Sequence, residues 1–220
     1  MAARGRTARV TPQNLREKSE EWLRRIEKYN VHRSPVGLDR SALLVIDMQK
    51  FFLGSRVASL MDAGTAILPN VKRLVDHYHE KGRPVIYTRH VHSPDGSDLG
   101  ILGEWWDEHC LEGTEEAEIH DSIAPGPEDT VISKHRYSAF YGTDMDELLA
   151  DLHVEEIVIS GVMTNICCES TARDAFFRDM WVRFVADATA SITEEMHMAT
   201  LLSLAYAFAE VCLTEDVLRA

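Results

Sequence analysis

Two adjacent cysteines, Cys167 and Cys168, lie in the stretch from Glu156 to Ala175, after a short apolar run and a glycine. The β-branched residues at 157–159 predict a strand, Gly161 predicts a tight turn, and the following residues favour a helix. A cysteine in the first helical turn lies near unpaired N–H groups and the positive end of the helix dipole, which stabilise a thiolate. Cys167 is therefore a candidate nucleophile. Buried cysteine is also a common core residue, so position alone leaves both interpretations open.

Two more residues with useful chemistry follow predicted strands. Asp47 comes after the unbroken apolar run at 42–46, and Lys134 comes after the run at 130–133. Ligands of open α/β sheets bind beyond the carboxyl ends of the strands, so both side chains should lie near Cys167. A carboxylate that takes the thiol proton and a lysine that holds charge nearby are what an activated thiol needs. Taken singly, a strand-end aspartate also caps turns and a lysine is usually a solvated charge.

The elements that must position these residues alternate along the chain. Apolar runs that suit strands buried on both faces alternate with segments of helical periodicity, and no internal repeat interrupts them. This alternation predicts an α/β fold, a doubly wound parallel sheet with helices on both faces. The expected strands are 42–46, 84–88, 130–133, 157–159, 182–186 and 210–214, and the expected helices are 63–81, 145–152, the segment that carries Cys167, and 194–209.

The chain divides into an N-terminal extension, residues 1–39, and a single domain, residues 40–220. The extension carries an amphipathic helix from Thr11, a predicted N-cap, to about Tyr29. Its apolar stripe suits packing on the domain or on a second subunit. The long segment at 89–127 lacks a strong period, which is more typical of a binding loop than of filler.

Composition narrows the possible functions. The formal net charge of −13 argues against general binding to nucleic acid or anionic membranes, which needs a basic surface. Four scattered cysteines suit a reducing cytoplasm better than a disulfide scaffold, and the N-terminal residues lack the apolar core of a secretory signal. No apolar run reaches the length of a membrane span, and neither GxxxxGK nor GxGxxG occurs. The sequence therefore predicts a cytoplasmic protein that has neither nucleic acid nor a membrane as its partner.

Three motifs resemble those of the isochorismatase-like cysteine hydrolases, which include nicotinamidases and N-carbamoylsarcosine amidases. They are VIDMQKFF at 45–52, KHRYSAFYGTD at 134–144 and GVMTNICCESTARDAF at 161–176. The resemblance covers about residues 40–216 and leaves the N-terminal helix as an extension. It implies a cysteine hydrolase that cleaves a C–N bond of a small amide, carbamoyl or ureido compound through a thioester. Relatives are commonly dimers or tetramers, so a homo-oligomer is also expected.

The resemblance also implies roles for individual residues. Cys167 would be the nucleophile, Asp47 the proton acceptor and Lys134 the third member of the triad. The backbone N–H groups of Met163 and Cys167 would form an oxyanion hole, with a cis peptide bond between Val162 and Met163. The candidate substrate-binding residues are Gln49, Phe52, Arg89, His92, Trp105, Tyr137 and Phe140.

A departure from the nicotinamidase pattern bears on metal binding. Nicotinamidases resemble one another in a metal site built on Asp-x-His after the second strand, and here that register reads His90-Val91-His92. The two histidines could share a metal with His109 or His120, but this spacing is weak evidence. No metal or other cofactor is predicted, and classical nicotinamidase activity is disfavoured.

Other functions stay open from the sequence. True isochorismatases resemble this chain in the Asp, Lys and RYSAF motifs, but they cleave a vinyl ether by acid catalysis and typically lack the cysteine. A catalytically silent binding module of the same fold is a second alternative. Redox sensing by Cys167 and Cys168 is a third, which the strain of a disulfide between adjacent cysteines disfavours.

Overall fold

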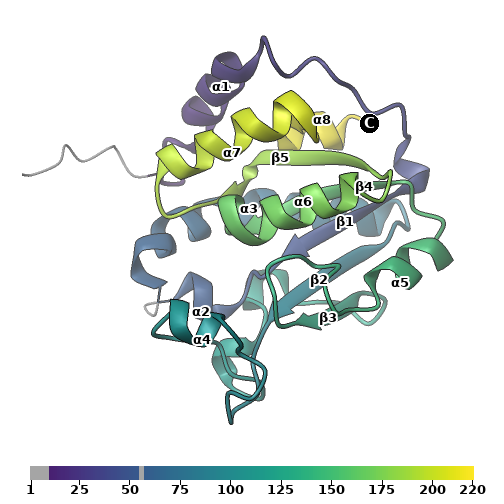
Figure 1. Ribbon diagram of the computed structural model, residues 1–220. Coiled ribbons are helices and arrows are strands. Elements are labelled where there is room, and N and C mark those ends of the chain that lie inside the picture. Colours follow the sequence, from purple (N-terminus) through teal and green to yellow (C-terminus); the bar gives the residue numbers. More distant parts are fainter. Residues whose placement is uncertain (1–9, 55–56) are drawn as a thin grey trace, which may run out of the picture.

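The computed structural model describes residues 10–54 and 57–220, without the side chains of 58, 59 and 61. Its centre is a sheet of six parallel strands in the order β3-β2-β1-β4-β5-β6 (Figure 1). The predicted doubly wound α/β fold is therefore confirmed. The strands are β1 (Ser41–Ile46), β2 (Val85–His90), β3 (Thr130–Lys134), β4 (Glu156–Val162), β5 (Trp181–Ala190) and β6 (Glu210–Cys212).

Helices cover both faces of the sheet. In Figure 1, α6 and α7 lie in front of the sheet, and α3 and α8 lie behind it. The α-helices are α1 (Leu15–Ile26), α2 (Lys50–Leu53), α3 (Ala58–Glu80), α4 (Leu102–Trp105), α5 (Met145–Asp151), α6 (Glu169–Phe176), α7 (Glu194–Ala207) and α8 (Thr214–Leu218). Because both faces are covered, the central strand β1 is buried along its whole length, as its unbroken apolar sequence predicts.

The direction of the chain across the sheet reverses between β1 and β4. From β1 the chain continues to β2 on one side, whereas from β4 it continues to β5 on the other. Ligand sites of open α/β sheets lie at such a switch point. The two strands approach closely here, because Gly161 has φ +112 and an added Cβ would lie 2.1 Å from the carbonyl oxygen of Ile46. A glycine is therefore required where β4 passes β1.

Several element boundaries differ from the sequence expectations. The first helix begins at Leu15, because Thr11 forms a turn in which its N–H donates to Asn14 Oδ1. Strand β4 continues through Gly161 rather than ending there, and β5 continues beyond Asp187 to Ala190. Thr214, expected at the end of the last strand, instead begins α8. Strands β4 and β5 continue because they pair with each other beyond the residues where local signals suggested an end, Gly161 with Thr189 and Val162 with Ala190.

Helix α1 packs against its own domain rather than standing apart from it. The side chain of Trp22 is buried, and its indole Nε1 donates to Glu194 Oε1 at 2.8 Å. Lys18 forms an ion pair with the same carboxylate. The apolar stripe of α1 is therefore covered by α7 and β5 within one chain.

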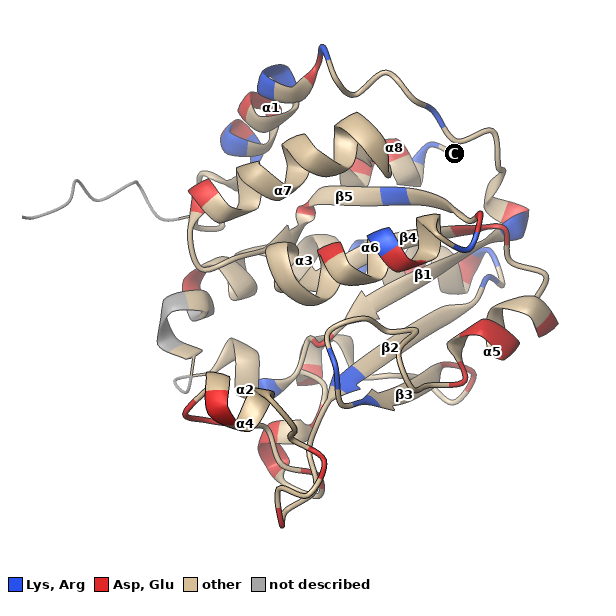
Figure 2. Cartoon of the chain, viewed as in Figure 1, with Lys and Arg blue, Asp and Glu red and all other residues tan. Residues whose placement is uncertain are grey.

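Charge is unevenly spread over the helices. Figure 2 shows basic and acidic residues mixed on α1, whereas all the charged residues of α5 are acidic. In the part of the chain that the structure describes, no helix is long and apolar enough to cross a bilayer.

Candidate active site

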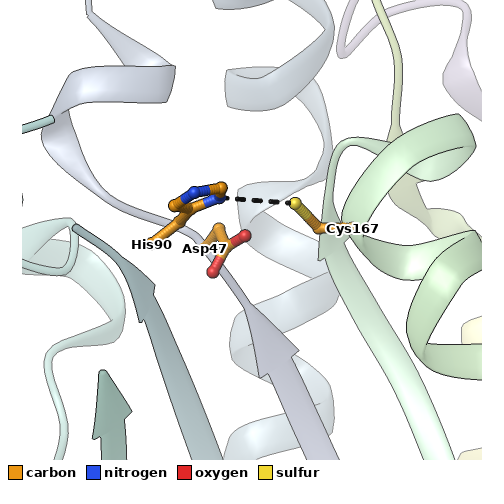
Figure 3. A group of neighbouring side chains, drawn as sticks. All are labelled: Asp47, His90 and Cys167. Carbon is orange, nitrogen blue, oxygen red and sulfur yellow. Dashed lines mark hydrogen bonds between the residues drawn. The ribbon is translucent and has the colours of Figure 1, made fainter. Parts of the chain in front are cut away.

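Asp47, Lys134 and Cys167 meet at the carboxyl ends of β1, β3 and β4. The Lys134 ammonium lies 2.7 Å from Asp47 Oδ2, and it also donates to the carbonyl of Arg136 at 3.1 Å. Cys167 Sγ lies within 4.8 Å of an Asp47 carboxylate oxygen. All three side chains are buried, so their charges interact with little screening by water. Figure 3 shows Asp47 and Cys167 on either side of the switch point.

The Asp47 carboxylate is fixed by a neighbouring strand. Thr88 Oγ1 on β2 donates to Asp47 Oδ1 at 2.6 Å, and the backbone N–H of Asp47 donates back to Thr88 Oγ1 at 3.2 Å. Asp47 also has φ +50, a left-handed conformation that is uncommon for a residue other than glycine. Strained backbone of this kind clusters at functional sites. It directs the carboxylate out of the strand toward Lys134.

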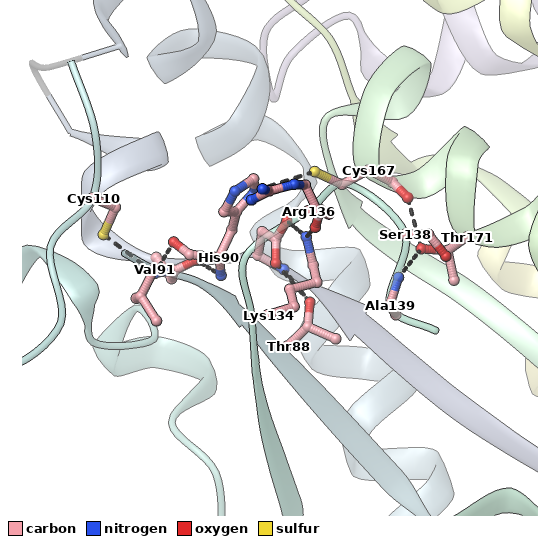
Figure 4. Close-up of polar contacts among 12 residues, drawn as sticks. Thr88, His90, Val91, Cys110, Lys134, Arg136, Ser138, Ala139, Cys167 and Thr171 are labelled. Carbon is pink, nitrogen blue, oxygen red and sulfur yellow. Dashed lines mark hydrogen bonds and ion pairs between the residues drawn. The ribbon is translucent and has the colours of Figure 1, made fainter. Parts of the chain in front are cut away.

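Cys167 lies in a π-helical turn, Thr164–Cys168, rather than in the first turn of the α-helix that follows. The carbonyl of Met163 accepts hydrogen bonds from the N–H groups of Ile166 and Cys168. Thr171 Oγ1 donates to the Cys167 carbonyl and accepts from the Ala139 N–H (Figure 4). The peptide bond between Val162 and Met163, which leads into this turn, is cis.

The surroundings of Cys167 act on its pKa in opposite directions. Burial raises the pKa of the Cys167 thiol, the Lys134 ammonium opposes that rise, and the Asp47 carboxylate adds to it. Contrary to expectation, Cys167 does not lie in the first turn of an α-helix, and desolvation works against its thiolate form. Burial also opposes the charge of Lys134, but the facing Asp47 and Cys167 outweigh it and raise the Lys134 pKa. Burial thus favours the protonated form of Cys167 beside the Asp47–Lys134 ion pair.

His90, at the end of β2, is the fourth group at this point. Its Nδ1 lies 3.8 Å from Cys167 Sγ, and its side chain is buried (Figure 3). Burial, and then the positive charge of Lys134, lowers the His90 pKa well below its ordinary value, so the imidazole is neutral. Sequence reasoning treated His90 only as a pocket or metal alternative. The signal was its spacing from Thr88, since residues two apart in a strand point to the same face.

A cavity of about 480 Å³ opens over these groups. Three of the candidate substrate-binding residues, Phe52, His92 and Tyr137, line it, and so does Trp106, whose Nε1 donates to the Tyr137 hydroxyl at 3.0 Å. The other lining residues are Asp47, Phe51, Val57, His90, Leu102, Asp107, Glu108, His109, Cys110, Val162, Met163, Ile166, Cys167 and Ile192. The walls are largely apolar, and the polar groups gather around Cys167 and the histidines.

Two polar residues predicted to bind substrate do not line this cavity. Gln49 is fully buried, with Oε1 accepting from the His90 N–H at 2.7 Å and Nε2 donating to backbone carbonyls of His90 and Ala117. Its amide joins loops and is not presented to a ligand. Arg89 points to the opposite side of β2 from His90 and pairs with Glu118 at 3.7 Å.

Two aromatic residues also lie elsewhere than predicted. Trp105 is 71% exposed at the end of α4, and the adjacent Trp106 faces the cavity instead. Phe140 is buried in the core, with the Arg178 guanidinium 4.5 Å above its ring. Whether Trp105 or Trp106 faces the cavity depends on how the loop folds over the sheet. Residue type alone does not reveal this.

The residues available for a metal do not fit one. Among the described residues, two groups of donors gather within 4.8 Å: Asp47 with His90 and Cys167, and His92 with Asp98 and His135. The first group faces the Lys134 ammonium, which opposes a cation. In the second, His135 Nδ1 lies 2.8 Å from the Val91 carbonyl, which only accepts, so this nitrogen carries a proton and offers no lone pair.

The previously suggested third ligands do not complete a site either. The His109 ring centre lies 5.9 Å from that of His92, and His109 is in neither donor group among the described residues. His120 Nδ1 bonds to Ser122 instead. No catalytic step is therefore assigned to a metal.

Residues 41–216 match the isochorismatase domain. The chain belongs to the isochorismatase family. It is 42% identical over 186 residues to nicotinamidase 3 of Arabidopsis thaliana, covering 83% of this chain and 89% of that protein. It is 31% identical to the isochorismatase of Bacillus subtilis (strain 168), covering 82% of this chain but only 57% of that longer protein.

A solved structure agrees with this assignment. The cysteine hydrolase from Pseudomonas syringae pv. phaseolicola 1448A superposes with a TM-score of 0.78 at 31% identity, covering 85% of this chain and 94% of that one. The nicotinamidase, the isochorismatase and the cysteine hydrolase given above are hydrolases by name, and the family match supports a hydrolase here. The members differ in the bond that their names imply, so the substrate must be argued from the site.

Proposed function

We propose that this isochorismatase-family protein is a cysteine amidohydrolase that cleaves a C–N bond of a small amide, carbamoyl or ureido compound. The observation that carries the proposal is the buried thiol of Cys167 beside the Asp47–Lys134 ion pair. A thiol with a carboxylate base within reach is equipped to attack a carbonyl carbon. A vinyl ether offers no such carbon, so acid-catalysed ether cleavage would leave Cys167 unused.

The proposed acylation step uses the thiol as the structure holds it. Asp47 takes the proton of Cys167 as the sulfur attacks the substrate carbonyl, so no free thiolate builds up beforehand. The negative charge passes from the carboxylate to the carbonyl oxygen of the tetrahedral intermediate, and Lys134 stabilises the charge that develops on the sulfur during the transfer. The backbone N–H groups of Met163 and Cys167 are the proposed donors to the oxyanion, a role typically worth about 3 kcal/mol of barrier for each donor. Asp47 returns the proton to the departing ammonia or amine and leaves a thioester on Cys167.

The cavity limits the size and polarity of the substrate. Its volume of about 480 Å³ and its aromatic walls suit a compact molecule with an apolar or planar part. Phe52, Trp106 and Tyr137 are the proposed contacts for that part. Nicotinamidase 3 from Arabidopsis thaliana acts, by its name, on a molecule of this kind. A planar carboxamide is therefore the first substrate class to test, followed by N-carbamoyl compounds and substituted ureas.

The test is ammonia release from a panel of primary amides, N-carbamoyl compounds and ureas. Cys167→Ala should abolish release. Cys168→Ala is the matched control, because the adjacent Cys168 is fully buried and is not among the residues that line the cavity. It should retain most of the activity. If Cys167→Ala stays as active as the parent, the thioester mechanism is wrong; if the parent cleaves only a vinyl ether, the isochorismatase alternative replaces it.

A further inference from the structure

A line of hydrogen bonds leads from Cys167 to the rim of the site. Cys167 Sγ faces His90 Nδ1 at 3.8 Å, and His90 Nε2 faces His92 Nε2 at 3.2 Å. His92 Nδ1 in turn faces Asp98 Oδ1 at 3.2 Å. Asp98 is held by the backbone N–H of Ser93, which lies 3.1 and 3.2 Å from its two oxygens. The Asp47–Lys134 pair does not belong to this line.

The Asp98 end of this line determines which atoms along it donate a hydrogen bond and which accept one. The Asp98 carboxylate only accepts, so His92 Nδ1 carries the proton and a neutral His92 has its lone pair on Nε2. His90 must then donate through Nε2, which leaves the lone pair of a neutral His90 on Nδ1, facing the sulfur. This assignment rests on the bonding partners, as tautomers in proteins generally do. The base that results is aimed at the atom on which the thioester forms.

The surroundings keep the His90 imidazole neutral at rest. The groups that face it are Lys134, His135 and Arg136 beyond β3, His92 beyond its own strand, Asp47 beyond β1, and Cys167 beyond β4. Burial and the positive groups lower the His90 pKa, whereas Asp98 opposes the lowering of the His92 pKa by burial. His90 is therefore neutral with a lone pair on Nδ1, and the Asp98–His92 pair offsets part of the cost of the imidazolium that forms during the reaction.

We infer that His90 is a second proton-transfer residue of the active site, which activates the water that hydrolyses the thioester, and that His92 and Asp98 position it. The inference rests on the proposed cysteine amidohydrolase function and assigns the deacylation half of that reaction. Asp47 is then the base for acylation and His90 the base for deacylation. Each base approaches the sulfur from a different strand, so both can act on one thioester carbon.

The proposed deacylation step uses only water, His90 and the thioester on Cys167. His90 Nδ1 takes a proton from water while the water oxygen bonds to the thioester carbonyl carbon. The tetrahedral intermediate collapses, the C–S bond breaks and the acid product leaves. The sulfur departs as a thiolate and takes back the proton from the His90 imidazolium. The thiol of Cys167 and the neutral His90 are thereby restored, and no other reactant is needed.

The experiment compares the parent and His90→Asn on whichever substrate of the panel releases ammonia. Asparagine keeps a polar group near Nδ1 but cannot accept the proton. We expect a rapid burst of ammonia stoichiometric with the subunit, followed by steady-state turnover about 100-fold slower than in the parent. Intact mass spectrometry should show the acyl group on Cys167. Hydroxylamine, which attacks a thioester without a base, should restore turnover. His153→Asn is the matched control and should behave as the parent, since His153 is exposed and has φ +52, which asparagine tolerates.

A second variant keeps the test informative if His90→Asn does not fold. Asp98→Asn alters a partly exposed side chain away from the sulfur. It should slow deacylation about tenfold without slowing the burst, and it should move the rising limb of the deacylation rate to lower pH, because the histidine pair loses its carboxylate. A merely structural role would slow both phases and leave the pH profile in place.

Three results would overturn the inference. One is unchanged turnover of folded His90→Asn. Another is that folded His90→Asn loses both the ammonia burst and turnover and shows no acyl group on Cys167. The third is a stoichiometric metal ion whose removal by a chelator stops deacylation in the parent, since a metal bound to both Nε2 atoms excludes the proton between them. Failure of the proposed function itself is recognised separately, because the parent then releases no ammonia from any substrate.

Discussion

The Lys134 ammonium and the Asp47 carboxylate form an ion pair at 2.7 Å, and neither side chain has more than 1% of its surface exposed. Burial of either charge alone would cost desolvation free energy, and the attraction between the two charges offsets that cost. The pair therefore joins β1 to β3 across the intervening β2, in addition to its proposed part in proton transfer. Replacement of either residue should lower both the stability and the activity of the protein.

Lys134→Met should lower the free energy of unfolding by about 3 to 5 kcal/mol, because it leaves the Asp47 carboxylate buried without a counterion. Urea denaturation measures the change. Lys72→Met is the control: Lys72 pairs with Asp76 at a similar distance, but on an exposed helix face, so the loss should stay below about 0.5 kcal/mol. Equal losses for the two variants would contradict the role assigned to burial.

Thr88→Val should lower kcat/KM about 10- to 100-fold, since it removes the hydroxyl that fixes Asp47 and a hydrogen bond to a charged group is worth about 1.5 to 3 kcal/mol. Steady-state kinetics on the best substrate measures it. Thr189→Val is the matched control, because Thr189 Oγ1 is buried without a hydrogen-bond partner among the described residues. That control should keep its activity and unfold no more easily than the parent.

Trp106→Ala should raise KM, with kcat/KM falling about tenfold, because the ring lines the cavity and supports the Tyr137 hydroxyl. Its neighbour provides the comparison. Trp105→Ala should leave both kinetic constants within about twofold, as its ring is exposed and lies outside the cavity wall. A larger effect at Trp105 would mean that the 89–127 loop closes differently over bound substrate.

His197 makes stability depend on pH. Burial lowers its pKa from 6.5 to about 3, so the folded protein holds it neutral while the unfolded chain protonates near 6.5. Above about pH 6.5 His197 is neutral in both states and does not change the free energy of unfolding. As the pH falls from 6.5 toward 3, only the unfolded chain takes up the proton, so the free energy of unfolding decreases by up to about 1.4 kcal/mol per pH unit. Urea denaturation of the parent and of His197→Phe between pH 6.5 and 5 measures it. The variant should show a shallower slope, and equal slopes would refute the assignment.

Much of the architecture was determined by the sequence itself. The unbroken apolar run of β1 can only be buried on both faces, and Asp47 ends that run, so its place at the carboxyl edge follows from local sequence. The same logic placed Lys134 at the carboxyl end of β3 and Cys167 beyond β4. Three motifs in order predicted the family to which the chain belongs. These inferences succeed because strand burial and strand order depend on patterns that short segments carry.

The direction of individual side chains was decided only by the tertiary structure. Arg89 and His90 are adjacent, yet one pairs with Glu118 outside the cavity and the other faces Cys167. The thiol pKa depends on how completely the fold excludes water, and burial raises it. The line from Cys167 through His90 and His92 to Asp98 exists because the 89–127 loop folds back over the strand ends. Contacts between distant segments set these outcomes, and local sequence does not encode them.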